Sequence, residues 1–478
     1  MGSGDGSGSD DDEPIPTNVK NNTCSTVMIN DGTVVSVQAN VNKSLDNNNI
    51  KIWPNIFSTS TVEKCVKDVF LPNGFPASVT PDYIEYQMWD SLQAFASSVT
   101  GTLAARAVLS GVGVGDSAAT VMGATVTWLL KDGAGMVGRI VFAWIRGSEF
   151  DSDSKKWRLF ADILNDIAIG LDMASQYFKP YVTAVLCLAN VTRSLVGVAG
   201  GATRAALTQH QAVANNLADV SAKDGSQETL VNLSALVFSL MLVPYLEHIS
   251  PSTIWLIFSI GASVHIWCNY RAVRAIRMKT FNRKRLKLLF DGFVQNNMDR
   301  LPTVDDVNMS EPLLADFVPW KRSMKECHVV YGGGLKDLFI DSKNGAENMA
   351  VWHTFELRNY LINYHSINSF GKRKRYNIVI SLPEESTARH EIEACCFAFF
   401  VAGKLTTTKD VSETALNKID NNYYDYENPA MLRVWLEEFD VIFKRFSELV
   451  EEARWETSYH LLCYSDIRLT ACSDVGGR

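Results

Sequence analysis

The apolar residues of this chain are concentrated between about residues 90 and 270, and the longest run almost without charge covers residues 229–270. Only one formal charge, Glu247, interrupts it. The segments 230–246 and 253–270 would each form a helix about 26 Å long, close to the roughly 30 Å hydrocarbon core of a bilayer. The break between them leaves room only for a tight turn. The pattern therefore predicts a helical hairpin that crosses a membrane, with the lipid bilayer as its partner.

A basic run follows the second segment and predicts its orientation. It consists of Arg271, Arg274, Arg277, Lys279, Arg283, Lys284, Arg285 and Lys287. Cytosolic loops of membrane proteins are rich in Lys and Arg, so both hairpin ends and everything after residue 270 are expected on the cytosolic side, with lipid contact by the basic residues. One alternative stays open. Both segments are short for membrane spans, and a buried helical hairpin in a soluble protein has similar apolar runs.

The first 62 residues predict no packed core. They begin with an acidic tail rich in Gly and Ser, typical of disorder. Two alternating segments, 25–29 and 33–38, flank Asn30-Asp31-Gly32 and predict a small β-hairpin, followed by an Asn-rich linker. The tail resembles neither a secretory signal nor an organelle transit peptide, so insertion is expected through internal spans, into an intracellular membrane. Nine scattered cysteines without a C-x-x-C pair favour reduced thiols.

Apolar stretches rich in small residues precede the hairpin, at 95–114, 118–130, 136–145 and 163–190. Helical character is expected from about Tyr83. The pairs Gly111/Gly115 and Gly197/Gly201 have the G-x-x-x-G spacing that allows two helix backbones to approach closely in lipid. The string Asp224-Gly225-Ser226-Gln227 resembles a capping box, which predicts that the helix of the first span begins there.

Beyond residue 300 the pattern changes to that of a soluble α+β domain. Residues 376–382 predict a strand, and the apolar face formed by Ile392, Cys395, Cys396, Phe399 and Phe400 predicts a helix that Gly403 ends. Asn428-Pro429 is expected to open a longer helix with an apolar side, from Leu432 to Phe446. Such faces serve either as core or as contacts with a partner.

The fold class predicted is therefore mainly α, with a membrane-embedded helical N-terminal region and an α+β C-terminal domain in the cytosol. The expected divisions are 1–62, 63–290 and 291–478. The net charge of −8 excludes nucleic acid as an expected partner.

No catalytic signature is complete. Gly111-Val112-Gly113-Val114-Gly115-Asp116 lacks the third glycine of a dinucleotide-binding loop, and His390-Glu391 lacks the second histidine of a zinc protease. Neither enzyme activity nor a cofactor or metal is therefore expected.

Polar residues among the small-residue helices are the candidate ligand-binding residues. Ionisable groups at membrane depth are costly, and they pair with one another or contact a substrate. A buried pair of Asp162 with Arg193 or Arg204 is the first expectation. The alternative is that these helices lie at the membrane surface or in a soluble part, where the charges are simply solvated. The candidate polar path consists of Asp162, Asp166, Arg193, Arg204, His210, Asn216, Lys223 and Asp224.

Long strings within residues 65–290 resemble the root UV-B sensitive family. They include Ser78-Val79-Thr80-Pro81-Asp82-Tyr83, Trp89-Asp90-Ser91-Leu92-Gln93, Trp157-Arg158-Leu159-Phe160-Ala161-Asp162, Gly200-Gly201-Ala202-Thr203-Arg204 and Ala222-Lys223-Asp224-Gly225-Ser226-Gln227-Glu228-Thr229. The resemblance implies a membrane-associated protein without established enzymatic activity. Plant relatives are linked to ultraviolet-B responses, auxin transport and the balance of pyridoxine-type vitamins, and they act in pairs. The resemblance thus implies a homo- or hetero-oligomer with another family member.

Two functions remain in competition at this point. The first is a non-enzymatic, multi-pass protein that moves or senses a small solute along the polar residues. The second is a membrane-anchored scaffold whose C-terminal domain binds protein partners through the helix that Asn428-Pro429 opens and the basic turn at 372–375. The number of spans separates them, because carriers have many spans and an anchor needs one hairpin.

Overall fold

The computed structural model describes most of the chain, in two compact units, Met1–Val62 and Glu63–Arg478. The described residues are 25–28, 34–37, 59–111, 121–246, 249–314, 327–339, 345–367, 375–415, 430–465 and 467–469. In the first unit, β1 (Ser25–Met28) pairs with β2 (Val34–Val37) in antiparallel register, Ser25 opposite Val37. The predicted β-hairpin is confirmed.

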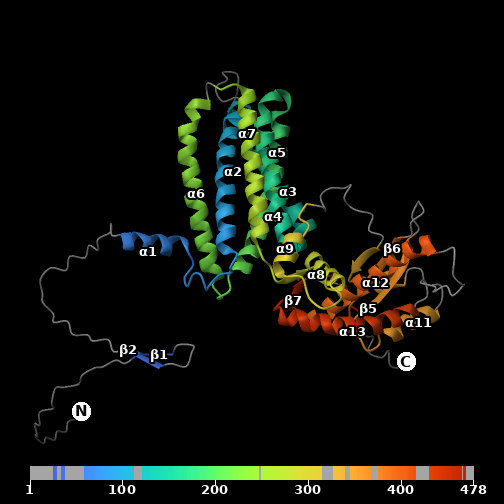
Figure 1. Ribbon diagram of the computed structural model, residues 1–478. Coiled ribbons are helices and arrows are strands. Elements are labelled where there is room, and N and C mark those ends of the chain that lie inside the picture. Colours follow the sequence, from blue (N-terminus) through green and yellow to red (C-terminus); the bar gives the residue numbers. More distant parts are fainter. Residues whose placement is uncertain are drawn as a thin grey trace, which may run out of the picture. The chain divides into compact units, whose positions relative to one another are not determined.

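Helix α1 (Thr59–Phe70), which the sequence analysis missed, crosses the division between the two units. The second unit continues into a bundle of long helices (Figure 1). The bundle contains α2 (Tyr83–Gly111), α3 (Val121–Arg146), α4 (Ser154–Ala174), α5 (Val182–Gln211), α6 (Leu217–Leu246) and α7 (Pro251–Ala275). The helix α2 begins at Tyr83, as predicted. The apolar stretch 163–190 is not one helix, because two 3₁₀ turns, η2 (Ser175–Tyr177) and η3 (Lys179–Tyr181), separate α4 from α5 around Pro180. A further turn, η1 (Gly147–Glu149), follows α3.

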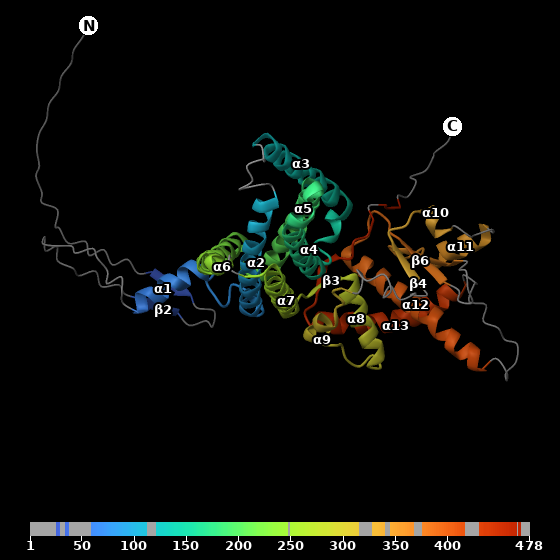
Figure 2. The same ribbon diagram turned by 90° about the horizontal axis from the view of Figure 1, so that it is seen from above.

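Among the described residues, three helices are long and apolar enough to cross a membrane: α5, α6 and α7. The predicted segments 230–246 and 253–270 lie inside α6 and α7, so the two helices of the hairpin are confirmed. They are not each other's main partners, because α2 packs against both and lies between them (Figure 2). Outward-facing Leu233 and Leu240 on α6 and Leu256 and Ile260 on α7 are exposed. The bundle thus presents an apolar outer surface.

The first of these two apolar helices starts earlier than predicted. The helix α6 begins at Leu217, about two turns before Asp224, the residue expected to cap it. Asp224 lies inside the helix, where its carboxylate accepts hydrogen bonds from Arg204 and Gln87 instead of from a terminal backbone amide. The capping-box interpretation is therefore wrong, since tertiary pairing and not helix initiation explains the carboxylate.

The predicted glycine contact at Gly197/Gly201 is also wrong. Among the described residues, no atom outside the local backbone of α5 lies within 4 Å of a Cβ built at Gly201, and at Gly197 the nearest such atom, from Arg139, is 3.9 Å away. The spacing alone could not tell an inward from an outward face. The other pair, Gly111/Gly115, falls partly outside the described residues.

Close helix approach instead occurs at Gly135 of α3, which faces α5. A Cβ at this position would lie 2.4 Å from Nδ2 of Asn190 and 2.7 Å from Oγ of Ser194. Both side chains are held, because Asn190 donates to the carbonyl oxygen of Lys131 at 2.8 Å and Ser194 donates to the carbonyl oxygen of Asn190 at 2.9 Å. The missing side chain of Gly135 therefore allows α3 and α5 to pack.

We expect Gly135→Ala to destabilise the protein by about 1–3 kcal/mol, because the new methyl group displaces two hydrogen-bonded side chains from a packed helix contact. The measurement is the unfolding temperature of the full-length protein in lipid nanodiscs. The matched control is Gly201→Ala, which should leave stability unchanged or raise it by up to about 1 kcal/mol through helix propensity. Equal effects of the two substitutions would contradict the packing role of Gly135.

The C-terminal part of the second unit is an α+β region. Its strands are β3 (Thr280–Asn282), β4 (Cys327–Tyr331), β5 (Leu361–Ile367), β6 (Arg375–Ser381) and β7 (Glu456–Leu461). Its helices are α8 (Arg283–Gln295), α9 (Val304–Ser310), α10 (Leu335–Leu338), α11 (Gly345–Thr354), α12 (Ala388–Ala415) and α13 (Ala430–Glu452). One sheet has the order β4-β6-β5, with β4 parallel and β5 antiparallel to β6, and β3 pairs with β7 in parallel. The strand predicted at 376–382 is confirmed as β6.

The apolar faces of α12 and α13 are core faces. All of Leu432, Trp435, Leu436, Phe439, Phe443 and Phe446 are buried in one hydrophobic cluster with α8 and α12. This burial removes the reason to treat α13 as a docking surface for a partner. Gly403 does not end α12, which continues to Ala415, so that prediction is wrong. The basic turn before β6 falls mostly outside the described residues.

Several residues of the basic run bind residues of the C-terminal region. Arg274 donates to the carbonyl oxygens of Met309 and Glu311, and Arg283 donates to that of Leu462 at 2.6 Å. Arg285, only 1% exposed, is paired with Glu311 at 2.9 Å. These residues therefore have partners within the protein, and the expected lipid contact remains a prediction. The cytosolic orientation remains a prediction.

Candidate functional site

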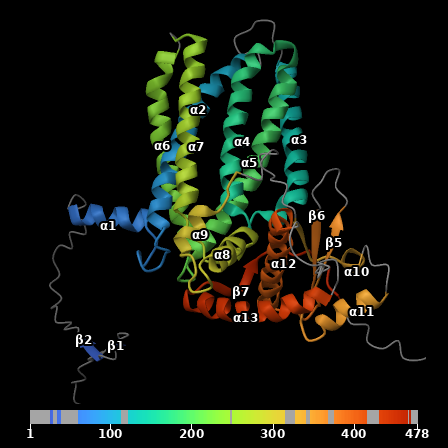
Figure 3. The ribbon, with the colours of Figure 1, turned by 45° about the vertical axis from the view of Figure 1, so that its right-hand side comes forward.

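We call the end of the bundle where α2 begins and α7 ends the base. A cleft of about 1060 Å³ lies there, which we call the base cleft. The bundle forms one wall, and β3, β7 and α9 form the other (Figure 3). Residues from the segment before α2, the end of α5, and the α7–β3 connection meet here. The polar residues that line it are Thr80, Asp82, Asp151, Gln209, His210, Arg277, Lys279, Thr280, Thr303, Asp305, Glu456 and Tyr459.

Asp82 organises the bundle side of this cleft. One of its carboxylate oxygens lies 3.0 Å from Nε2 of His210 and accepts from the backbone N–H of Arg277 at 2.6 Å. Burial by itself would raise the pKa of Asp82, but the hydrogen bond and charge of His210 together with the Arg277 amide outweigh it and lower the pKa to about 2. The side chain of Arg277 turns away from Asp82 and pairs with Asp305 at 2.7 Å.

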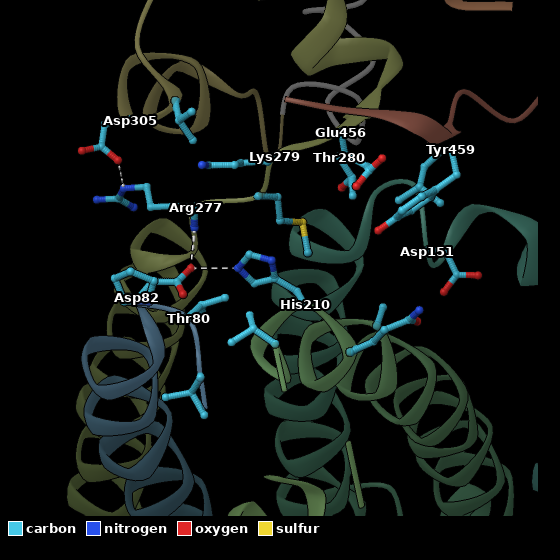
Figure 4. Close-up of a pocket in the computed structure, with 18 of the residues that line it drawn as sticks. Thr80, Asp82, Asp151, His210, Arg277, Lys279, Thr280, Asp305, Glu456 and Tyr459 are labelled. Carbon is cyan, nitrogen blue, oxygen red and sulfur yellow. Dashed lines mark hydrogen bonds and ion pairs between the residues drawn. The ribbon is translucent and has the colours of Figure 1, made fainter. Parts of the chain in front are cut away.

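The opposite side brings an aromatic ring and charges of both signs together. Figure 4 shows Tyr459 and Glu456 across the cleft from Asp82 and His210, with Lys279 and Thr280 between the two sides. Tyr459 is half-exposed and Lys279 is exposed. A cleft of this size with a few convergent polar groups is typical of small-molecule sites. Its chemistry suits a small aromatic solute that carries hydroxyl groups and charge.

A second polar cluster lies inside the bundle, between α2, α4 and α7. Arg158 donates to the carboxylate of Asp90 at 2.8 Å, and Gln93 donates to the same carboxylate at 3.2 Å. Gln93 also contacts Nε2 of His265 at 2.8 Å, and Nδ1 of His265 lies 2.9 Å from Asp166. We call Asp90, Gln93, Arg158, Asp166 and His265 the bundle cluster.

The predicted polar residues are distributed over several places. Asp166 belongs to the bundle cluster, and Asp162 lies next to it, 3.9 Å from Arg158. The expected pairing of Asp162 with Arg193 or Arg204 is therefore wrong. These arginines lie on α5 and have nearer partners, Asp172 for Arg193 and Asp224, at 2.6 Å, for Arg204.

The remaining predicted residues bind other parts of the protein away from the base cleft, except for His210. The side chain of Asn216 accepts from the backbone N–H of Ala214 at 3.2 Å, and Lys223 donates to the carbonyl oxygen of Asp68 in α1. Arg204 also pairs with Glu228. His210 alone among the eight predicted residues lines the base cleft.

Sequence reasoning missed most of the residues of the cleft and four of the five residues of the bundle cluster. Asp82 is 128 residues from His210, and nothing in the local pattern links the two. His265 did carry a signal, because a lone titratable residue in the middle of a predicted span is by default a functional candidate. Within the described ranges, no group of three or more His, Cys, Asp or Glu side chains is placed to hold a metal ion.

Comparisons with known proteins agree on one family. A model described as a vitamin B6 photo-protection and homoeostasis domain matches residues 58–297, and one of the root UVB sensitive protein C-terminal region matches residues 300–470. No solved structure matches the chain.

Two relatives match this chain over about half of their own length. The chain is 47% identical over 274 residues to RUS family member 1 of Dictyostelium discoideum, which is 57% of this chain and 50% of that protein. It is 44% identical over 230 residues to protein root UVB sensitive 3 of Arabidopsis thaliana, which is 48% of this chain and 52% of that protein. The chain thus spans about half the length of these two relatives. Because the first family model alone matches half of the chain, this protein belongs to the root UVB sensitive family.

Proposed function

We propose that this protein is a non-enzymatic integral membrane protein that binds a pyridoxine-type vitamin B6 vitamer in the base cleft and moves or senses it. The observation that carries the proposal is the cleft itself, where Tyr459, Lys279 and Asp82 surround about 1060 Å³ at the end of three potential spans. The vitamin B6 description of the matching domain supports the choice of ligand class.

The groups in the cleft match the chemistry of such a solute. A pyridine ring stacks on a tyrosine ring, an arrangement worth about 0.5–1.5 kcal/mol beyond area burial. Hydroxyl groups and a protonated ring nitrogen donate hydrogen bonds and need acceptors, and Asp82 and Glu456 carry carboxylates. Lys279 supplies a cation for a phenolate or a phosphate. Since the cleft adjoins the basic run, the positive-inside tendency puts its opening on the cytosolic side.

The test is binding of pyridoxine, pyridoxal and pyridoxal phosphate to the purified full-length protein in nanodiscs, measured by calorimetry. We expect Tyr459→Ala to weaken all three about tenfold, which corresponds to about 1.4 kcal/mol. Lys279→Gln should weaken the phosphorylated vitamer most, because it removes a charge that faces the anion. Both residues are exposed, so neither substitution disturbs a core.

Asp299→Asn is the matched control, since Asp299 is exposed and does not line the cleft. It should leave all three affinities unchanged. Absence of binding by the wild type, or equal binding by all variants, would refute the proposal. Uptake of the bound vitamer into sealed vesicles then separates moving from sensing, because a sensor binds without accumulation.

A further inference from the structure

His265 occupies a costly position. It is fully buried in α7, between Asp166 on α4 and Gln93 on α2. At 1.5 Å per residue it lies about 15 Å from the base end of α7 and about 21 Å from the other end. In a spanning helix this position is near the middle of the hydrocarbon core. Ionisable residues there mark solute paths and proton relays.

The hydrogen bonds around the ring fix its proton count. Gln93 donates its amide N–H to Asp90 at 3.2 Å, so the amide oxygen is the atom that faces Nε2 of His265. On the other side Nδ1 faces the carboxylate of Asp166. A neutral imidazole has one N–H and cannot donate to two acceptors. The pair of His265 and Asp166 therefore holds one proton more than a neutral ring and a carboxylate would.

The surrounding charges favour this extra proton. The helices that pack on α7 here are α2 and α4. They bring three carboxylates, Asp90, Asp162 and Asp166, and a single guanidinium, Arg158, and α7 itself adds the thiol of Cys268 and the amide of Asn269. With the proton bound the group carries one net negative charge, and without it two. A larger uncompensated charge is costly where water is excluded.

We propose that His265, Asp166 and Gln93 form a proton-binding site that the protein loads and empties. When the proton leaves to water, His265 keeps one N–H for Asp166, and Nε2 becomes an acceptor that faces the Gln93 oxygen. The Gln93 amide must then rotate to donate to the ring, and Asp90 loses that donor. The site thus has two discrete hydrogen-bond arrangements, one with the proton bound and one with the proton released.

The hydrogen bonds that change with the proton extend from His265 toward the base cleft. Asp90 also accepts from Arg158 and from the hydroxyl of Tyr86, and Tyr86 lies in the first turn of α2, four residues after Asp82. Asn269 and Asp162, each one turn nearer the base than His265 and Asp166, hold buried polar atoms without a hydrogen-bond partner in the described part of the chain. Such atoms bind water, which provides a proton route to the base.

The test is the protonation state of each histidine, read by ¹⁵N NMR of imidazole-labelled full-length protein in nanodiscs at pH 7.5. An unperturbed histidine is about one-tenth protonated at this pH. We expect one signal of a ring with both nitrogens protonated, absent in His265→Gln and retained in His353→Gln, an exposed control. If Asp166 holds the proton instead, the His265 signal is that of a neutral ring, and the infrared spectrum shows the band of a protonated carboxyl group from Asp166.

A second variant keeps the proposal testable if His265→Gln does not fold. Asp166→Asn removes the counter-charge with little change in shape, and it should lower the protonated fraction of His265 about tenfold at pH 7.5. A neutral His265 ring beside an ionised Asp166 in the wild type would overturn the proton site. So would a doubly protonated wild-type ring whose signal is unchanged in Asp166→Asn. No vitamer is present in this experiment. A negative result would therefore refute the proton site alone, and vitamer binding is tested separately by calorimetry.

Discussion

Replacing Glu311 with glutamine is expected to lower the free energy of unfolding by about 3–5 kcal/mol, because it leaves two buried cations without their shared counter-charge. Glu311 is 3% exposed and pairs with Arg285 at 2.9 Å and with Lys155 at 3.4 Å. Lys155 comes from the start of α4 and Arg285 from α8, so this cluster holds the bundle and the C-terminal region together. The measurement is denaturant-induced unfolding of the full-length protein in nanodiscs.

The same residue predicts the acid sensitivity of this junction. Burial alone would raise the pKa of Glu311, but Arg285, Lys155 and a hydrogen bond from Asn282 outweigh it and lower the pKa to about 2 from an ordinary value of 4.5. The ionised form is therefore favoured in the folded state. Its contribution is complete above pH 4.5 and is lost as the pH falls to about 2. The stability gap between wild type and Glu311→Gln should close across that window.

Asp291→Asn is the matched control for Glu311→Gln. Asp291 pairs with Lys287 four residues away on the exposed side of α8, at 2.7 Å. Exposed pairs of this kind contribute about 0.3–0.5 kcal/mol, so the control should change stability little. If Glu311→Gln costs no more than Asp291→Asn, the buried charge cluster does not join the two parts.

The sequence predicted those elements whose pattern is local. The alternation around Asn30-Asp31-Gly32 is enough for a hairpin, and the apolar side of the helix after Asn428-Pro429 is enough to predict which residues are buried. The apolar segments within α6 and α7 follow from length and lack of charge. In each case the contacts that determine the element join residues within a few helical turns or one tight loop, where the periodicity of apolar residues is informative.

Features that depend on distant residues could not be predicted in this way. The basic run after residue 270 has the same appearance whether lipid or protein neutralises it, and only the fold shows Arg285 against Glu311. The spacing of Gly197 and Gly201 does not reveal which face of α5 they occupy. The base cleft combines residues from before α2, the end of α5 and β7, so no single stretch of sequence contains its pattern.

Two arginines on the outer face of α6 are expected to abolish membrane integration. Leu233 and Leu240 are exposed, at 55% and 65%, and lie seven residues apart on one face of this potential span. An arginine near the centre of a span costs about 2.5–3.5 kcal/mol for insertion, so Leu233→Arg with Leu240→Arg would cost about 5–7 kcal/mol. After an alkaline carbonate wash, we expect the wild type in the membrane pellet and the double variant mostly in the supernatant.

The control places the same two charges on an exposed face that the membrane should not touch. Val434 and Val441 on α13 are 55% and 75% exposed and also lie seven residues apart. Arginine at both should leave the protein in the pellet, because α13 belongs to the C-terminal region and not to the bundle. Release of the wild type by carbonate, or full retention of the α6 variant, would mean that this face meets water or another protein. The open alternative, a buried helical hairpin in a soluble protein, would then replace the spanning bundle, and the proton site would lose its membrane context.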